Sequence, residues 1–275
     1  MAKSANGAVR TPRSCLRGVE RNLSRFAALA RDLLGDKIRW IVEVGARDCR
    51  ETLGFAEQFP CASIFAFECN PDTLPACRAA VAGRQNIRLI EKAAAERAGR
   101  LDFYPVDPAV NAGASSLYPA TGRYELEHYP QRRIDVEAVT LQSFLEAEAI
   151  PRIDLLWMDI QGAELAALKG LGARIADVAL IHAEVEFEEI YAGQPLFPEL
   201  RSFLAARGFR FLGFTIYARH SADAVFANRR VLGGFSILRA LAASPLLLRK
   251  RLQHLRHRIK RRLGLQGASN ASRRP

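Results

Sequence analysis

Two segments of the sequence place residues suited to nucleoside binding at the ends of apolar runs. In Glu43-Val44-Gly45-Ala46-Arg47-Asp48, the glycine can take a positive φ and let a ligand approach the backbone. Glu68 ends the next apolar run, 23 residues after Gly45. An acid at a spacing of about 20 residues can accept hydrogen bonds from both ribose hydroxyls of a nucleoside. The alternative is that Glu68 is a solvated loop acid or caps the following helix.

A third polar segment, Asp159-Ile160-Gln161-Gly162, follows the apolar run at 154–158. Polar groups at strand ends line the cleft of an α/β sheet, so Asp159 and Gln161 are candidates for the same site. Asp159 could instead cap the next helix. Neither Gly-x-Gly-x-x-Gly nor the Lys-Ser/Thr ending of a P-loop occurs, so a phosphate-binding loop is not predicted.

These segments need a parallel sheet to bring them together. Apolar runs at 40–44, 63–67, 87–90, 154–158 and 178–184 alternate with helical patterns, which is typical of a doubly wound α/β sheet. Runs at 209–216 and 225–232 follow one another with no helix between them, which predicts a closing hairpin. We therefore predict a Rossmann-like class I methyltransferase fold. It would have a seven-stranded, mostly parallel sheet with one antiparallel strand, and helices on both faces.

The charge divides the chain into a neutral body and a basic tail. The formal net charge is +11, yet the last acidic residue is Asp223, and residues 239–275 hold eleven Lys and Arg. We predict an N-terminal extension with a helix (1–37), a methyltransferase domain (38–235) and a basic amphipathic tail (236–275). The tail suits a helix on an anionic membrane surface. A solvated tail or a partner helix is the alternative, and nucleic acid is disfavoured because no recognition pattern accompanies the charge.

Cysteine usage and hydropathy point to a reducing compartment. The five cysteines form no Cys-x-x-Cys pair, and no Cys/His spacing suits zinc. The N-terminus has no apolar core of a secretory signal, and no run of about 18 uncharged apolar residues occurs. We expect a cytoplasmic protein, peripheral at the inner face of the membrane if the tail binds lipid. The oligomeric state cannot be read from the sequence.

The motifs resemble those of the FkbM family of methyltransferases. Its most specific part is Met158-Asp159-Ile160-Gln161-Gly162-Ala163-Glu164 followed by Leu168-Lys169-Gly170. Residues 43–52, 65–71, 114–117, 139–141 and 184–211 also fit, so the resemblance covers about residues 38–217. It implies use of S-adenosylmethionine and O-methylation, mainly of sugars and polyketide-type natural products. The expected acceptor is a sugar hydroxyl of a glycan, glycolipid or natural product.

The resemblance also implies roles for individual residues. Asp159 would lie at the methyl-transfer end and Glu68 at the ribose. The family commonly has Asn and Gly where this sequence has Arg47 and Cys49, which leaves the detailed shape of the turn open, although Gly45 is kept. The remaining cofactor-binding positions would be Glu43, Gly45, Ala46, Arg47 and Asp48 in the turn, Cys69, Ala93 and Ala94 around the adenine, and Ser116.

A hydroxyl is a poor nucleophile, so O-methylation calls for a general base or a metal. Asp159, Glu184 and His182 are the candidate bases, and a bound divalent metal could assist, although no motif supports one. His182 and Glu184 lie two residues apart and so share a strand face. His182 could equally be a buried structural histidine, and Glu184 a structural acid. Gln161, Tyr118 and Tyr191 are the candidate substrate-binding residues. Aromatic rings suit sugar faces, but the tyrosines could equally be ordinary packing residues.

Two other functions remain open at this point. A nucleotide-sugar or NAD oxidoreductase shares the sheet, but the glycine fingerprint is missing. A Tyr-x-x-x-Lys pair is also missing, since the residue four positions after Tyr191 is Pro195 rather than lysine. A non-catalytic, membrane-associated binding module of the same fold would keep the sheet and lose turnover.

Overall fold

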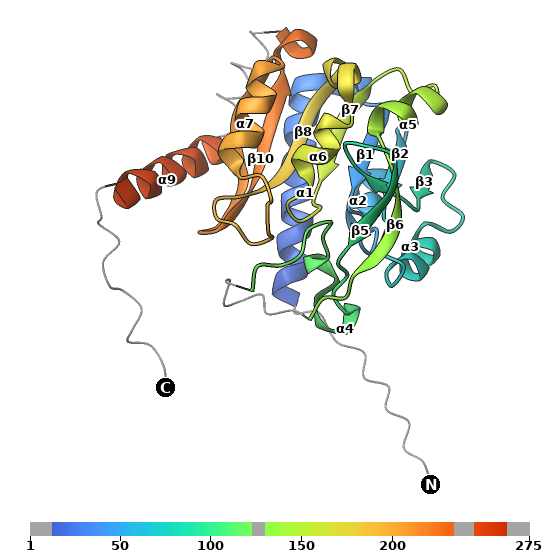
Figure 1. Cartoon of the computed structure of the whole chain (residues 1–275). Helices are drawn as coiled ribbons and strands as arrows, with labels where there is room; N and C mark the ends of the chain where they lie inside the picture. The colour runs from blue at the N-terminus through green and yellow to red at the C-terminus, as the bar shows by residue number, and fades with distance from the viewer. Residues whose placement is uncertain (1–12, 123–129, 234–244, 263–275) are drawn as a thin grey trace.

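A seven-stranded sheet forms the centre of the chain (Figure 1). The computed structural model describes residues 13–122, 130–233 and 245–262. The strand order is β3-β2-β1-β7-β8-β10-β9. Of these seven strands, β10 alone runs in the direction opposite to the other six. This confirms the predicted class I methyltransferase sheet. Its strands are β1 (Trp40–Val44), β2 (Ser63–Phe67), β3 (Ile87–Ile90), β7 (Ile153–Met158), β8 (Val178–Glu186), β9 (Phe209–Tyr217) and β10 (Ser221–Asn228).

The last strand differs from the prediction in its bounds. We expected it at 225–232, but β10 begins at Ser221 and ends at Asn228, and residues 229–233 are helical. The buried Asn228 side chain donates to the carbonyl oxygens of Ala176 and Val178 and accepts from the backbone N–H of Arg230. Asparagine favours such local turns, so it ends the strand despite the apolar residues that follow.

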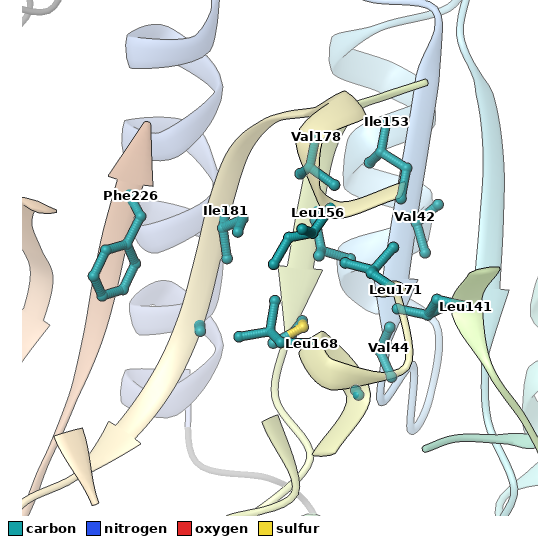
Figure 2. Close-up of a cluster of buried hydrophobic side chains, with 14 of the residues drawn as sticks. Val42, Val44, Leu141, Ile153, Leu156, Leu168, Leu171, Val178, Ile181 and Phe226 are labelled. Atoms are coloured by element: carbon teal, nitrogen blue, oxygen red, sulfur yellow. The ribbon is translucent and has the colours of Figure 1, made fainter. Parts of the chain in front are cut away.

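Helices cover both faces of the sheet, as predicted. On one face, α1 (Arg13–Leu34), α2 (Arg50–Gln58) and α3 (Leu74–Val81) pack against alternate strand residues such as Ile41 and Leu155. On the other face, α5 (Leu141–Ala147), α6 (Glu164–Lys169) and α7 (Phe197–Ala206) pack against the intervening residues. Figure 2 shows Val42, Leu156 and Ile181 in that second core. The two-residue period of the strands thus builds two separate cores.

A second, three-stranded sheet lies beside the first. It pairs β4 (Ala93–Ala94) with β6 (Ile134–Val139) in parallel, and β6 with β5 (Gly99–Phe103) in antiparallel orientation. Short helical segments follow at α4 (Pro108–Asn111) and η2 (Ala112–Ala114), while η1 (Gly35–Lys37) and η3 (Gly172–Asp177) precede β1 and β8. This sheet supplies one wall of the site described below.

The basic helix α9 (Pro245–Arg262) packs against β9 at the edge of the main sheet (Figure 1). The rest of the predicted tail, 236–244 and 263–275, lies outside the described residues. Within the described part of the chain, no helix is both long enough and apolar enough to cross a membrane. At the other end of the chain, Phe26 of α1 contacts Trp157 of β7 and His182 of β8, so α1 covers the centre of the sheet.

Candidate active site

A cavity with about 760 Å³ of atom-free space, part of it open to solvent, lies at the carboxyl ends of β1, β2 and β7. The second sheet and the η2 segment close it from the side. It is lined by Val44, Gly45, Arg47, Glu51, Phe67, Glu68, Cys69, Asn70, Thr73, Lys92, Ala93, Ala94, Phe103, Ala112, Gly113, Ser115, Leu117, Trp157, Asp159, Ile160 and Gln161.

The turn after β1 joins the three strand ends. The backbone N–H groups of Gly45 and Ala46 both donate to the carbonyl oxygen of Phe67, at 3.0 and 2.9 Å. The N–H of Asp159 donates to the carbonyl of Val44 at 3.0 Å. Gly45 has φ +92°, and a Cβ there would lie 2.1 Å from the carbonyl oxygen of Asp159. Only glycine fits this position, for conformation as well as for space.

The two positions where the sequence departs from the family pattern share one backbone feature. Arg47 has φ +49° and Cys49 has φ +58°, both in the left-handed region. Asparagine and glycine adopt that region most easily, which explains why the family commonly carries them there. Arg47 and Cys49 adopt it here at a cost of about 1 kcal/mol each.

Glu68 lies between the turn and the cavity with only 8% of its surface exposed. Its Oε2 accepts the N–H of Arg47 at 2.6 Å, and its Oε1 accepts the N–H of Asn70 at 2.7 Å. Burial raises the pKa of Glu68, and these backbone hydrogen bonds oppose that effect. Since each carboxylate oxygen offers two lone pairs, acceptor capacity remains for ligand hydroxyls. Glu68 therefore fixes the turn and presents an acceptor to the cavity.

The wall beyond Glu68 is largely apolar. Cys69, Ala93 and Ala94 line it as predicted, together with Phe103 of β5 and Leu117. Burial raises the pKa of the Cys69 thiol, so the group stays neutral and acts as a small apolar side chain. An aromatic ring and small side chains on one wall suit the flat face of a nucleobase.

The other end of the cavity holds a hydrogen-bonded network centred on Gln161. Gln161 Nε2 donates to Asp159 Oδ1 at 2.8 Å and to Glu184 Oε2 at 2.5 Å. The buried Tyr191 hydroxyl lies 2.9 Å from Gln161 Oε1 and 3.1 Å from the carbonyl oxygen of Ala114. Ser116 Oγ donates to the Gln161 carbonyl at 2.7 Å. Side chain and backbone of Gln161 are thus both held, and Gln161 in turn orients two carboxylates.

Those two carboxylates belong to a larger acidic group. Burial raises the pKa of Glu184 well above its ordinary range, and neighbouring Asp159 raises it further. Burial and Asp159 also raise the pKa of Asp223 to about 8, although Asn22 of α1 donates to its Oδ2 at 2.7 Å. Burial likewise raises the pKa of Glu51, on the cavity wall. Carboxyls whose pKa is raised bind a proton more readily than free carboxylates do, which suits them to proton transfer during a reaction.

Several predicted residues lie behind the cavity wall. Glu43 is 1% exposed and accepts a hydrogen bond from Thr52 Oγ1, so it ties β1 to the first turn of α2. The cavity lining, as given above, likewise excludes Ala46, Asp48, Ser116, Glu184, Tyr118 and Tyr191. Of these, Glu184, Ser116 and Tyr191 reach the site through their contacts with Gln161.

The structure does not bring His182 to the site. Its ring stacks on Trp157 with centroids 3.6 Å apart, and Nε2 lies 3.0 Å from Thr215 Oγ1. Burial lowers the pKa of His182 to about 3, so the ring is neutral. His182 does share a face with Glu184, but it lies deeper along β8, in the core beneath α1. This geometry favours the structural interpretation and leaves Asp159 and Glu184 as the candidate bases.

Sequence reasoning missed the cavity residues that come from irregular segments. Phe103 belongs to the second sheet and Leu117 to the loop after η2. Neither follows a parallel strand of the main sheet, so the pattern of strand ends could not predict them. Asn70 and Thr73 could have been found, because they lie in the short segment between Glu68, at the carboxyl end of β2, and the start of α3. In the described residues, no three His, Cys, Asp or Glu side chains are grouped as a metal site would require.

The model of the family described as "Methyltransferase FkbM domain" matches residues 43–211. The chain belongs to the FkbM methyltransferase family. The family prediction made from the sequence is thereby confirmed. The matched region contains every strand of the main sheet from β2 to β8, and the whole cavity wall. It ends within β9, so the FkbM model covers neither α1 nor α9.

The chain is also similar to the 2-O-methyltransferase NoeI of Sinorhizobium fredii (strain NBRC 101917 / NGR234), with 30% identity over 160 residues. The match covers 56% of this chain and 66% of NoeI. Among solved structures, methyltransferase FkbM from Methylobacillus flagellatus KT shows 11% identity and a TM-score of 0.47, covering 72% of this chain and 47% of that one. Magnesium protoporphyrin IX methyltransferase from Synechocystis PCC 6803 shows 10% identity and a TM-score of 0.46, covering 81% and 86%.

Proposed function

We propose that this chain is an S-adenosylmethionine-dependent methyltransferase that methylates a sugar hydroxyl of a glycan, glycolipid or natural product. The observation that carries the proposal is the convergence of the Gly45 turn, Glu68 and Asp159 on one cavity. Membership of the FkbM methyltransferase family supports the reaction class. The name of NoeI, a 2-O-methyltransferase, supports oxygen as the acceptor atom.

The donor set of the cavity fits S-adenosylmethionine. Glu68 would accept hydrogen bonds from the ribose hydroxyls, and Phe103 with Ala93 would hold the adenine. Arg47 and Glu51, at the opposite end, would bind the charged groups of the amino-acid part. When bound, the cofactor supplies an electrophilic methyl group on a positively charged sulfur. Asp159, which lines that end of the cavity, would face this charge.

Asp159 is the carboxylate best placed to take the acceptor proton, because it lines the cavity and Gln161 orients it. Glu184 accepts a hydrogen bond from the same Gln161 side-chain amide. The raised pKa of Glu184 suits it to share the proton with Asp159. Tyr191 acts through Gln161 and is a positioning residue. The protein must also hold the acceptor in line with the bond that breaks and exclude water, for which the partly enclosed cavity is suited.

Calorimetry and a methyl-transfer assay test the proposal together. The chain is titrated with S-adenosylmethionine and, separately, with NAD. We expect saturable binding of the first only; binding of NAD alone would favour an oxidoreductase. Labelled methyl transfer is then measured on oligosaccharides with a free 2-hydroxyl and on their 2-deoxy counterparts. Transfer to neither set, with cofactor binding intact, would favour a binding module without turnover.

A further inference from the structure

Among the described side chains of helix α9, two histidines make ring contacts and a hydrogen bond with the rest of the protein. The His254 ring contacts the rings of Phe187 and Phe214, with centroids 4.8 and 5.4 Å apart. His257 Nδ1 lies 3.0 Å from the Tyr217 hydroxyl, and the two rings stack. The docked face of α9 is therefore fixed by two histidines against β9 and the end of β8.

The opposite face of α9 presents large aliphatic side chains to solvent. Leu252, Leu255 and Ile259 are 48%, 49% and 49% exposed. At about 100° per residue, these positions fall within an arc of about 60°, on the side of the helix away from His254. Three of the six large hydrophobic residues that are exposed in the described part of the chain lie on this one stripe. A continuous exposed stripe of this kind marks an interaction surface.

Basic residues border the stripe, and α9 itself contains no acidic residue. Arg249 and Arg256 are exposed along one edge of it. Eight of the 18 residues in the sequence of α9 are Lys or Arg, and the chain has no acidic residue after Asp223. Apolar side chains bordered by arginine match a bilayer surface, where acyl chains lie beneath anionic headgroups.

We propose that α9 docks the protein on an anionic membrane surface, lying flat with Leu252, Leu255 and Ile259 among the acyl chains. The helix, about 27 Å long, would place its arginines at the level of the phosphates. Nucleic acid would use the arginines but leave the aliphatic stripe in water. A second copy of the chain would bury the stripe but bring like charges together. Both are outcomes that the experiment distinguishes.

The test is co-sedimentation of the full chain with vesicles of phosphatidylcholine, with or without about 30% phosphatidylglycerol. We expect binding to the anionic vesicles only, and its loss at about 0.5 M salt. The double variant Leu255→Asp/Ile259→Asp should lower the partition coefficient about 100-fold, because two apolar anchors are lost and two like charges are added. Arg249→Gln/Arg256→Gln should lower it about tenfold.

Val231→Asp is the matched control, because Val231 is 46% exposed but lies outside α9. It should bind vesicles as the wild type does, and all variants should keep the wild-type melting temperature. Equal vesicle binding by Leu255→Asp/Ile259→Asp and wild type would overturn the proposal. So would a dimer, seen by light scattering, that the same variant converts to monomer. Binding to labelled DNA or RNA that survives the Leu255→Asp/Ile259→Asp change, with no vesicle binding, would assign the basic helix to nucleic acid instead.

Discussion

Replacing Glu68 by Gln tests the nucleoside site at its most informative residue. The carboxylate accepts backbone N–H groups at 2.6 and 2.7 Å, and we propose that it also accepts both ribose hydroxyls. Hydrogen bonds to a charged acceptor contribute about 1.5–3 kcal/mol each. Gln keeps one acceptor oxygen and turns the other position into a donor, so we expect the loss of about 3 kcal/mol of binding, or about 100-fold in Kd.

The same substitution affects the fold, because one backbone N–H then faces an amide donor. We expect a loss of about 2 kcal/mol in the free energy of unfolding, seen as a lower melting temperature. Affinity alone would therefore not separate a ribose contact from a distorted turn. The assay is calorimetry with S-adenosylhomocysteine and with its 2′,3′-dideoxy analogue, for wild type and variant, well below the melting temperature.

The wild type should bind the dideoxy analogue about 100-fold more weakly, and Glu68→Gln should discriminate less than about tenfold. Glu57→Gln, at an exposed position of α2, is the control and should behave as wild type. If the wild type and Glu68→Gln discriminate equally between the two ligands, Glu68 does not contact the ribose and the reasoning is refuted.

Four further variants test the rest of the site. Asp159→Asn should lower kcat at least about 100-fold while changing the Kd for S-adenosylmethionine less than about threefold; an unchanged kcat would remove Asp159 as the base. Tyr191→Phe should lower kcat about tenfold with KM little changed, since it loosens Gln161 without touching the substrate. Gly45→Ala should cost more than about 3 kcal/mol in unfolding free energy, measured by urea denaturation, because its Cβ meets a carbonyl oxygen. Asp223 has a folded pKa of about 8 against 3.8, so wild-type stability should fall as pH rises from about 4 to about 8. Asp223→Asn should flatten that slope and gain about 2 kcal/mol at pH 8.5; an unchanged slope would show that Asp223 is not protonated in the native state.

The parts of the site that the sequence predicts are those that follow strand ends. Gly45, Glu68 and Asp159 each come directly after a short apolar run, and parallel strands end on one edge of the sheet. Their meeting could therefore be expected without any knowledge of distances. The antiparallel β10 followed similarly from two strand patterns with no helix between them.

The sequence does not predict how deeply a residue lies along its strand, or which irregular segments reach the cavity. Alternation places His182 and Glu184 on one face of β8, and the structure agrees. It does not tell which of them reaches the strand end, and His182 stacks on Trp157 in the core. The aromatic wall at Phe103 comes from a separate small sheet, whose pairing depends on contacts distant in sequence. The side of α9 that faces the protein is also unexpected, because among its described side chains two histidines make the contact.

A crystal structure with S-adenosylhomocysteine tests the central claim most directly. We expect density in the cavity, with the ribose hydroxyls within hydrogen-bonding distance of Glu68, the adenine beside Phe103, and the sulfur between the Gly45 turn and Asp159. Density for the ligand elsewhere, or a cavity that stays empty at saturating ligand, would contradict the assignment of this chain as a methyltransferase.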